Sequence, residues 1–106
     1  MKKIAIFNIL GSSNGRPNQS FSSKIPPYFI WVRETDRKRW VRWRRVKNFS
    51  ISDEKDQVYV LVVNGEGGTI VRFGDGKQGM IPSQGSDNIK ATYRRGKGEE
   101  GKINSK

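Results

Sequence analysis

The chain has 106 residues, of which 33% are apolar, enough for one domain with a modest core. It contains no cysteine and no histidine, which excludes disulfides, thiolate or imidazole metal ligands and the commonest general base. Lysine and arginine number 21 against 10 acidic residues, so the formal net charge is +11 and a polyanionic or acidic partner is favoured. No apolar run approaches the ~20 residues that span a bilayer, so no membrane insertion is expected.

The apolar residues are of the types that favour strands. Isoleucine and valine together number 18 and the aromatic residues 11, whereas leucine, alanine and methionine number two each. β-Branched and aromatic side chains suit a pleated surface, and 12 glycines can supply turns. The composition therefore predicts an all-β fold: a small single-domain sandwich or partly open barrel of about six strands.

The N-terminal third begins with an apolar stretch, and residues 2–9 are predicted as a strand. The first ten residues mimic a signal peptide, but Asn8 interrupts the apolar run and no small-residue cleavage site follows it, so we expect no secretion by a signal peptide. Residues 11–23 are rich in Gly, Ser, Asn and Pro and are predicted as an ordered loop, with Phe21 as its anchor. Residues 28–33 follow as a strand.

The stretch 40–49 has two readings. Trp40, Trp43 and Val46 recur every three residues as in a helix, whereas alternation from Val41 through Trp43 fits a strand. The β pattern on either side favours the strand. Alternation then turns Trp43 inward with Val41, while Arg42 points outward.

The second half of the chain carries the clearest strand pattern. Residues 57–63 are apolar on both faces, and the turn NGEGG joins them to residues 69–73 in a predicted hairpin. Residues 88–94 alternate and form the last predicted strand. We expect one β-domain over residues 1–94 and a flexible Gly/Lys-rich tail over residues 95–106. The expected core comprises Tyr59, Leu61, Val71, Phe73, Ile89 and Tyr93.

The segment 74–79 matches the G-x-G-x-x-G pattern of dinucleotide-binding loops. That function needs a helix directly after the loop, and Met80-Ile81-Pro82 follows instead. We therefore predict a structural turn with at least one glycine at positive φ, formed by Gly74, Asp75, Gly76 and Gly79. No catalytic, cofactor or metal site is predicted, because the remaining acidic residues lie in turns without a metal-binding spacing.

The positive charge is concentrated in the first half of the chain. Residues 1–47 carry a net charge of +10 and residues 48–106 a net charge of +1, and Arg37–Lys47 contains seven bases without an acid. We interpret this run as a docking face formed by Arg37, Lys38, Arg39, Trp40, Arg42, Trp43, Arg44, Arg45 and Lys47.

Two alternatives to a docking face stay open. One is a basic nucleic-acid-binding β-barrel domain, in which Arg37–Lys47 contacts phosphates and Trp40 or Trp43 stacks on bases. The other is a solvated cationic surface that keeps the domain soluble. Non-specific, salt-sensitive binding of polyanions is expected in every case from a chain of this charge.

Several blocks of the sequence resemble one known family. Residues 8–21, NILGSSNGRPNQSF, are similar to the LG-S-x-G-x-P-x-Q-x-F opening of a domain in large baseplate assembly proteins, the baseplate J-like wedge group of contractile phage tails and related injection systems. Similar blocks then follow in the same order over residues 8–101: W-x-x-V-x-x-F at 43–49, YVL at 59–61, VRFGDG at 71–76, IP at 81–82 and NI-x-A-x-YR at 88–94.

The resemblance implies a non-enzymatic structural module that docks to other subunits of a baseplate-like assembly. It implies a place in the cytoplasm or within a virion or phage-tail-like particle, and an isolated domain of this kind can remain monomeric. The family supplies no catalytic or cofactor residues to carry over. The chain departs from the family in the density of arginine and lysine over residues 33–47 and in the end GKIN, where the family has Gly-Asn-Val.

Overall fold

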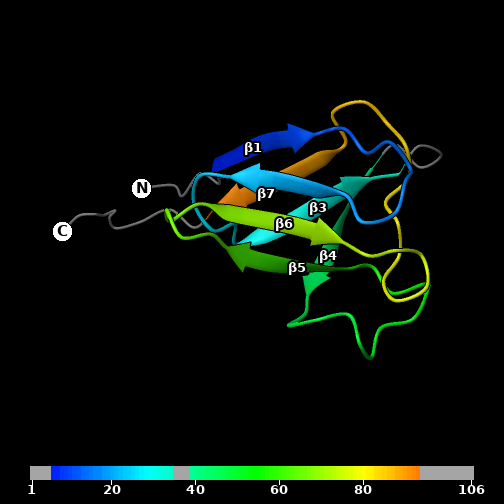
Figure 1. Ribbon diagram of the computed structural model, residues 1–106. Helices are drawn as coiled ribbons and strands as arrows, with labels where there is room; N and C mark the ends of the chain where they lie inside the picture. Colours follow the sequence, from blue (N-terminus) through cyan, green and yellow to red (C-terminus); the bar gives the residue numbers. More distant parts are fainter. Residues whose placement is uncertain (1–5, 35–38, 94–106) are drawn as a thin grey trace.

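The computed structural model describes residues 6–34 and 39–93, and these residues contain strands and no helix (Figure 1). The prediction of an all-β fold is confirmed. The seven strands are β1 (Ile6–Gly11), β2 (Ser20–Ser23), β3 (Phe29–Arg33), β4 (Trp40–Arg45), β5 (Val58–Val63), β6 (Thr69–Phe73) and β7 (Ile89–Tyr93).

The strands form one sheet in the order β1-β7-β3-β4-β5-β6-β2, which curls into a nearly closed barrel (Figure 1). Five of the six neighbouring pairs are antiparallel. The exception is the join between β4 and β5, which is parallel and only two residue pairs long, Arg44 with Val58 and Arg45 with Tyr59. The two end strands, β1 and β2, face each other across the seam of the barrel.

The inward faces of the strands form a single core. Its fully buried members are Ile30, Val32, Trp43, Tyr59, Val71, Phe73, Ile89 and Ala91. Trp43 meets Phe73 edge to face at a centroid distance of 5.4 Å, so the core joins the two sides of the barrel. Burial of each large apolar side chain stabilises the fold by roughly 1.5–3 kcal/mol. Four of the six residues expected in the core are fully buried, and Leu61 and Tyr93 are partly buried against it.

The loop predicted over residues 11–23 is wrong in its last four residues, because Ser20–Ser23 forms strand β2 against β6. Its serine-rich composition resembles a loop, but Phe21 lies opposite Val71 and packs against Phe73 at a centroid distance of 5.8 Å. Long-range pairing and one aromatic contact therefore create a strand that local composition does not indicate. Residues 2–5 and 95–106, predicted as the start of the first strand and as the tail, lie outside the described residues.

The buried side-chain amide of Asn88 joins the loops at one end of the barrel by hydrogen bonds. Asn88 is 1% exposed, and its Oδ1 accepts a hydrogen bond from the Ser13 backbone N–H at 2.9 Å. Its Nδ2 donates to the carbonyl oxygens of Ser83 at 2.9 Å and Arg33 at 3.2 Å. A single side chain therefore satisfies backbone groups from three separate segments.

Candidate functional site

Aromatic and cationic side chains share the outer surface of β1, β7, β3 and β4. Strand alternation turns every second residue outward, and the pairing places Trp31 beside both Lys90 and Arg42. We call this surface the cation–aromatic face; it comprises Phe7, Phe29, Trp31, Arg33, Trp40, Arg42 and Lys90. Four strands, from both ends of the chain, contribute to it.

The cations of this face lie over its rings. Lys90 Nζ is 4.3 Å from the centroid of Trp40, 5.3 Å from Phe7 and 5.7 Å from Trp31. The Arg42 guanidinium lies 4.3 Å from the ring of Phe29. Such contacts contribute about 0.5–1 kcal/mol each at exposed positions and hold flexible cationic side chains in place. The face is thus preorganised, with its charges in defined positions.

No acidic side chain balances these charges within the four strands. Apart from the face itself, their outward residues are Ile9, Thr92 and Arg44, and none of them is a carboxylate. Thr92 accepts a hydrogen bond from the Trp31 indole at 3.1 Å, which fixes the orientation of that ring. The positive field of the face is therefore left for solvent or for a partner.

The residues predicted as a docking face do not all lie on the surface. Trp43 is 2% exposed and belongs to the core, with its ring turned inward as the strand alternation predicts. Trp40 is half-buried, and Arg37 and Lys38 lie outside the described residues. The exposed members are Arg39, Arg42, Arg44, Arg45 and Lys47.

Several residues of the cation–aromatic face were not predicted from the sequence. Lys90, Phe7 and Phe29 are distant in sequence from the basic run, and only the pairing of β1, β7 and β3 brings them beside β4. The outward alternation of Phe29, Trp31 and Arg33 is the one local signal that indicates part of this surface.

A pocket of about 420 Å³ lies beside this face, at the start of β3 and the end of β4. We call it the arginine pocket; its polar lining residues are Arg42, Trp43, Arg44, Arg45 and Tyr59, and Pro27, Tyr28 and Phe29 complete its wall. Burial raises the pKa of the Tyr59 phenol, and the positive charges of Arg45 and Arg42 oppose that rise only in part. The phenol therefore stays protonated at neutral pH.

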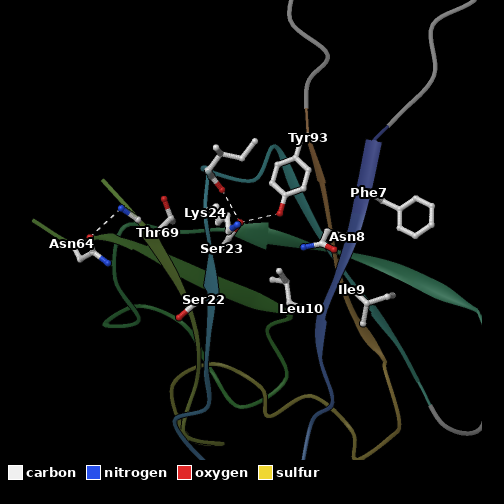
Figure 2. A pocket seen from close by; sticks show the side chains of 12 residues that line it. Phe7, Asn8, Ile9, Leu10, Ser22, Ser23, Lys24, Asn64, Thr69 and Tyr93 are labelled. Atoms are coloured by element: carbon white, nitrogen blue, oxygen red, sulfur yellow. Dashed lines mark hydrogen bonds between the residues drawn. The ribbon is translucent and has the colours of Figure 1, made fainter. Parts of the chain in front are cut away.

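A larger hollow, about 950 Å³, follows the seam between β1 and β2. Figure 2 shows Asn8 and Leu10 pointing into the gap, while Phe7 and Ile9 point to the other side of β1. The hydroxyls of Ser23 and Tyr93 hydrogen-bond each other at 2.9 Å across the seam (Figure 2). Lys24 is the only charged side chain among the described residues that line this hollow, so its chemistry is mainly that of hydroxyl, amide and apolar groups.

The turn over residues 74–79 is stabilised by hydrogen bonds between its own residues. Asp75 Oδ1 accepts the backbone N–H groups of Lys77 and Gln78 at 2.8 Å each, and these bonds lower the pKa of the Asp75 carboxyl. Gly76 has φ +89° and Gly79 φ +97°, which confirms the expectation of positive φ. The strand β6 enters the turn and no helix follows it, so the arrangement lacks the helix N-terminus that binds a pyrophosphate.

Replacing Gly76 with valine is expected to lower the free energy of unfolding by about 1–3 kcal/mol. A β-branched residue fits positive φ poorly, and a Cβ at Gly76 would lie 3.0 Å from Ile81 Cδ1. Urea unfolding measures the change. The matched control is Gly65→Val, because Gly65 does not have positive φ and has no heavy atom within 4 Å of an added Cβ. A Gly76→Val protein as stable as this control would contradict the prediction, as would tight binding of ATP or NAD.

The described ranges lack the features of a metal site and of a membrane-spanning helix. Residues 6–34 and 39–93 hold no group of three or more Asp and Glu side chains that could bind a metal ion. They also contain no helix long and apolar enough to cross a membrane. Comparisons with models of known protein families, with curated proteins and with solved structures find no match to this chain.

Proposed function

We propose that this chain is a non-enzymatic structural module that docks to an acidic surface of another protein through its cation–aromatic face. The observation that supports this most is the interleaving of tryptophan, phenylalanine, arginine and lysine on one face without a carboxylate. Tryptophan and arginine are the residue types most enriched at the energetic centres of protein interfaces. A preorganised face of this composition loses little side-chain entropy on binding.

The charge of the chain favours an acidic partner. The net charge is +11, of which +10 lies in residues 1–47, the half that contributes β1, β3 and β4. A positive field of this size accelerates association with an acidic surface and disfavours cationic partners. The planar guanidinium groups of Arg33 and Arg42 can each hold a carboxylate in two-point contact.

The kind of partner follows from the family resemblance. Residues 8–101 resemble a domain of large baseplate assembly proteins, whose role is structural. We therefore take the partner to be a neighbouring subunit of a phage-tail-like baseplate. An assembly role of this kind needs neither a catalytic residue nor a cofactor.

Nucleic-acid binding is the second candidate function, because cations interleaved with aromatic rings also suit a single strand. Base stacking, however, needs a free ring face. Lys90 and Arg33 both lie over Trp40, and Arg42 lies over Phe29. A stacked base would have to displace a cation from each ring, whereas a carboxylate can bind these same cations where they are.

Reversal of two charges on the face tests the proposal. We expect the double variant Arg33→Glu/Lys90→Glu to co-purify about tenfold less, or lower still, of the tail-tube, sheath or wedge proteins encoded by adjacent genes. The control is Arg72→Glu/Lys77→Glu, which changes the net charge equally at two exposed residues of β6 and the following turn. Co-purification with each purified gene product is the measurement.

Two results would overturn this proposal. Equal recovery of the partners by the face variant and the control would exclude the cation–aromatic face as the docking surface. Sequence-selective nucleic-acid binding in the nanomolar range at physiological salt, lost in Arg33→Glu/Lys90→Glu, would establish the second candidate instead.

A further inference from the structure

One residue that lines the arginine pocket, Trp43, has a buried indole donor without an acceptor. The indole Nε1 of Trp43 has no hydrogen-bond partner in the structure, although Trp43 is 2% exposed. Buried N–H groups are rarely left unpaired, because removal from water without a new partner costs free energy. Trp43 lines the arginine pocket, so the chemical shift of its indole proton can report on binding there.

Most of the other polar side chains that line the pocket are donors. Arg42, Arg44 and Arg45 line the pocket with guanidinium groups that can only donate hydrogen bonds. The positive charges of Arg45 and Arg42 act on the Tyr59 hydroxyl, and all three residues line the pocket. No residue that lines the pocket is acidic.

We propose that the arginine pocket is a binding site for a carboxylate, presented by an aspartate or glutamate side chain of the docking partner. The identity of the partner rests on the proposed function, whereas the affinity for a carboxylate rests on the pocket alone. A carboxylate carries negative charge and two acceptor oxygens, which matches a pocket lined by three guanidinium groups and no acidic side chain.

The size and the walls of the pocket suit an amino-acid side chain. A volume of about 420 Å³ accommodates one acidic side chain with its adjoining backbone. Pro27 and Phe29 supply apolar wall on which the methylene groups of that side chain can pack. The Arg42 guanidinium is held over Phe29 at 4.3 Å, so this donor is positioned before the ligand arrives.

The experiment titrates the full chain with a blocked Gly-Glu-Gly peptide and follows the indole N–H signals by NMR. The chain has three tryptophans, and Trp31→Phe and Trp40→Phe assign two of the signals and thereby the third. We expect the Trp43 indole proton to shift on titration, because this residue lines the pocket that the peptide enters. The matched ligand, blocked Gly-Gln-Gly, has nearly the same shape without the charge and is expected to bind at least about tenfold more weakly.

Conservative variants separate binding from folding. Tyr59→Phe and Arg45→Gln each remove hydrogen-bond donors while keeping most of the side-chain volume. Each is expected to weaken binding of the Glu peptide by about tenfold. Arg72→Gln removes the same charge from the outer surface of β6, outside the pocket, and is expected to leave the affinity within about twofold.

Three results would overturn the assignment. The Trp43 indole signal could remain unmoved up to millimolar peptide, the Gln peptide could bind equally, or Arg72→Gln could weaken binding as much as Arg45→Gln. A parallel titration with inorganic phosphate tests the other anion: binding at least tenfold tighter than the Glu peptide would assign the pocket to a phosphoryl group instead.

The outcome is distinguishable from that of the docking experiment. If the peptide binds the pocket but Arg33→Glu/Lys90→Glu still recovers the neighbouring proteins, the proposed docking face is wrong and the carboxylate site stands. If that variant loses its partners while the Trp43 signal never responds to the peptide, docking stands and the pocket assignment is wrong.

Discussion

Substitution of Gly74 by alanine is expected to lower the free energy of unfolding by about 3 kcal/mol or more. A Cβ at Gly74 would overlap the carbonyl carbon and oxygen of Gly79 and would lie 2.5 Å from its Cα. These are backbone atoms, so no side-chain rotation can relieve the overlap. The turn itself would have to open.

Opening the turn would disturb its neighbours as well. The Gly74 carbonyl accepts the Asn18 backbone N–H at 3.1 Å, and the Gly79 N–H donates to the Asp53 carbonyl at 3.0 Å. The close approach of Gly74 and Gly79 thus joins the turn to two other loops. Displacement of either residue would leave buried backbone groups without partners.

Thermal and urea unfolding measure this effect. Gly65→Ala is the control, because a Cβ at exposed Gly65 meets nothing within 4 Å, and it is expected to change stability by less than about 0.5 kcal/mol. If Gly74→Ala and Gly65→Ala proteins unfolded at the same urea concentration, the packing of the turn against itself would not be as described.

Replacing Asn88 with alanine is expected to cost about 3 kcal/mol of stability. The change leaves the Ser13 N–H without its acceptor and removes the donors to the carbonyls of Arg33 and Ser83, all at a site that is 1% exposed. Because β3 and β7 meet beside this residue, the loss also loosens the pairing that positions Arg33 on the cation–aromatic face. Urea unfolding monitored by tryptophan fluorescence provides the measurement.

The control for this residue is Asn48→Ala. Asn48 also accepts a backbone hydrogen bond, from Ser50 at 2.9 Å, but it does so in an exposed turn where water can replace it. A loss of less than about 1 kcal/mol is expected there. If the two alanine variants lost equal stability, burial of the Asn88 amide would not increase its contribution to the free energy of unfolding.

The strand content could be predicted from the sequence because it depends on residue type and alternation. The isoleucine and valine bias predicts the all-β class, and alternation turns Trp43 inward beside Val41. Strand β2 could not be found in this way, because its three serines give no hydrophobic pattern. Its existence depends on pairing with β6, some fifty residues further along the chain.

The surfaces were harder to predict than the strands. The basic run Arg37–Lys47 indicates charge, but three of the rings that hold the cations come from two other strands, β1 and β3. Register decides that Lys90 lies beside Trp31, and register is set by long-range pairing. The unpaired indole N–H of Trp43 could likewise not be predicted from the sequence, because it depends on how the core packs around that ring.

The short parallel join between β4 and β5 has a mechanical consequence. It divides the barrel into two half-sheets, β1-β7-β3-β4 and β5-β6-β2, each built of antiparallel ladders. Backbone hydrogen bonds at the join include Arg44 N–H to Gln57 and Val46 N–H to Tyr59, each 2.9 Å long. We therefore expect a force that pulls the two half-sheets apart to strain this join and the open seam first. Each half-sheet would then move as one rigid unit about the Trp43–Phe73 contact. The barrel is thus expected to open at the β4–β5 join and the β1–β2 seam before either half-sheet deforms.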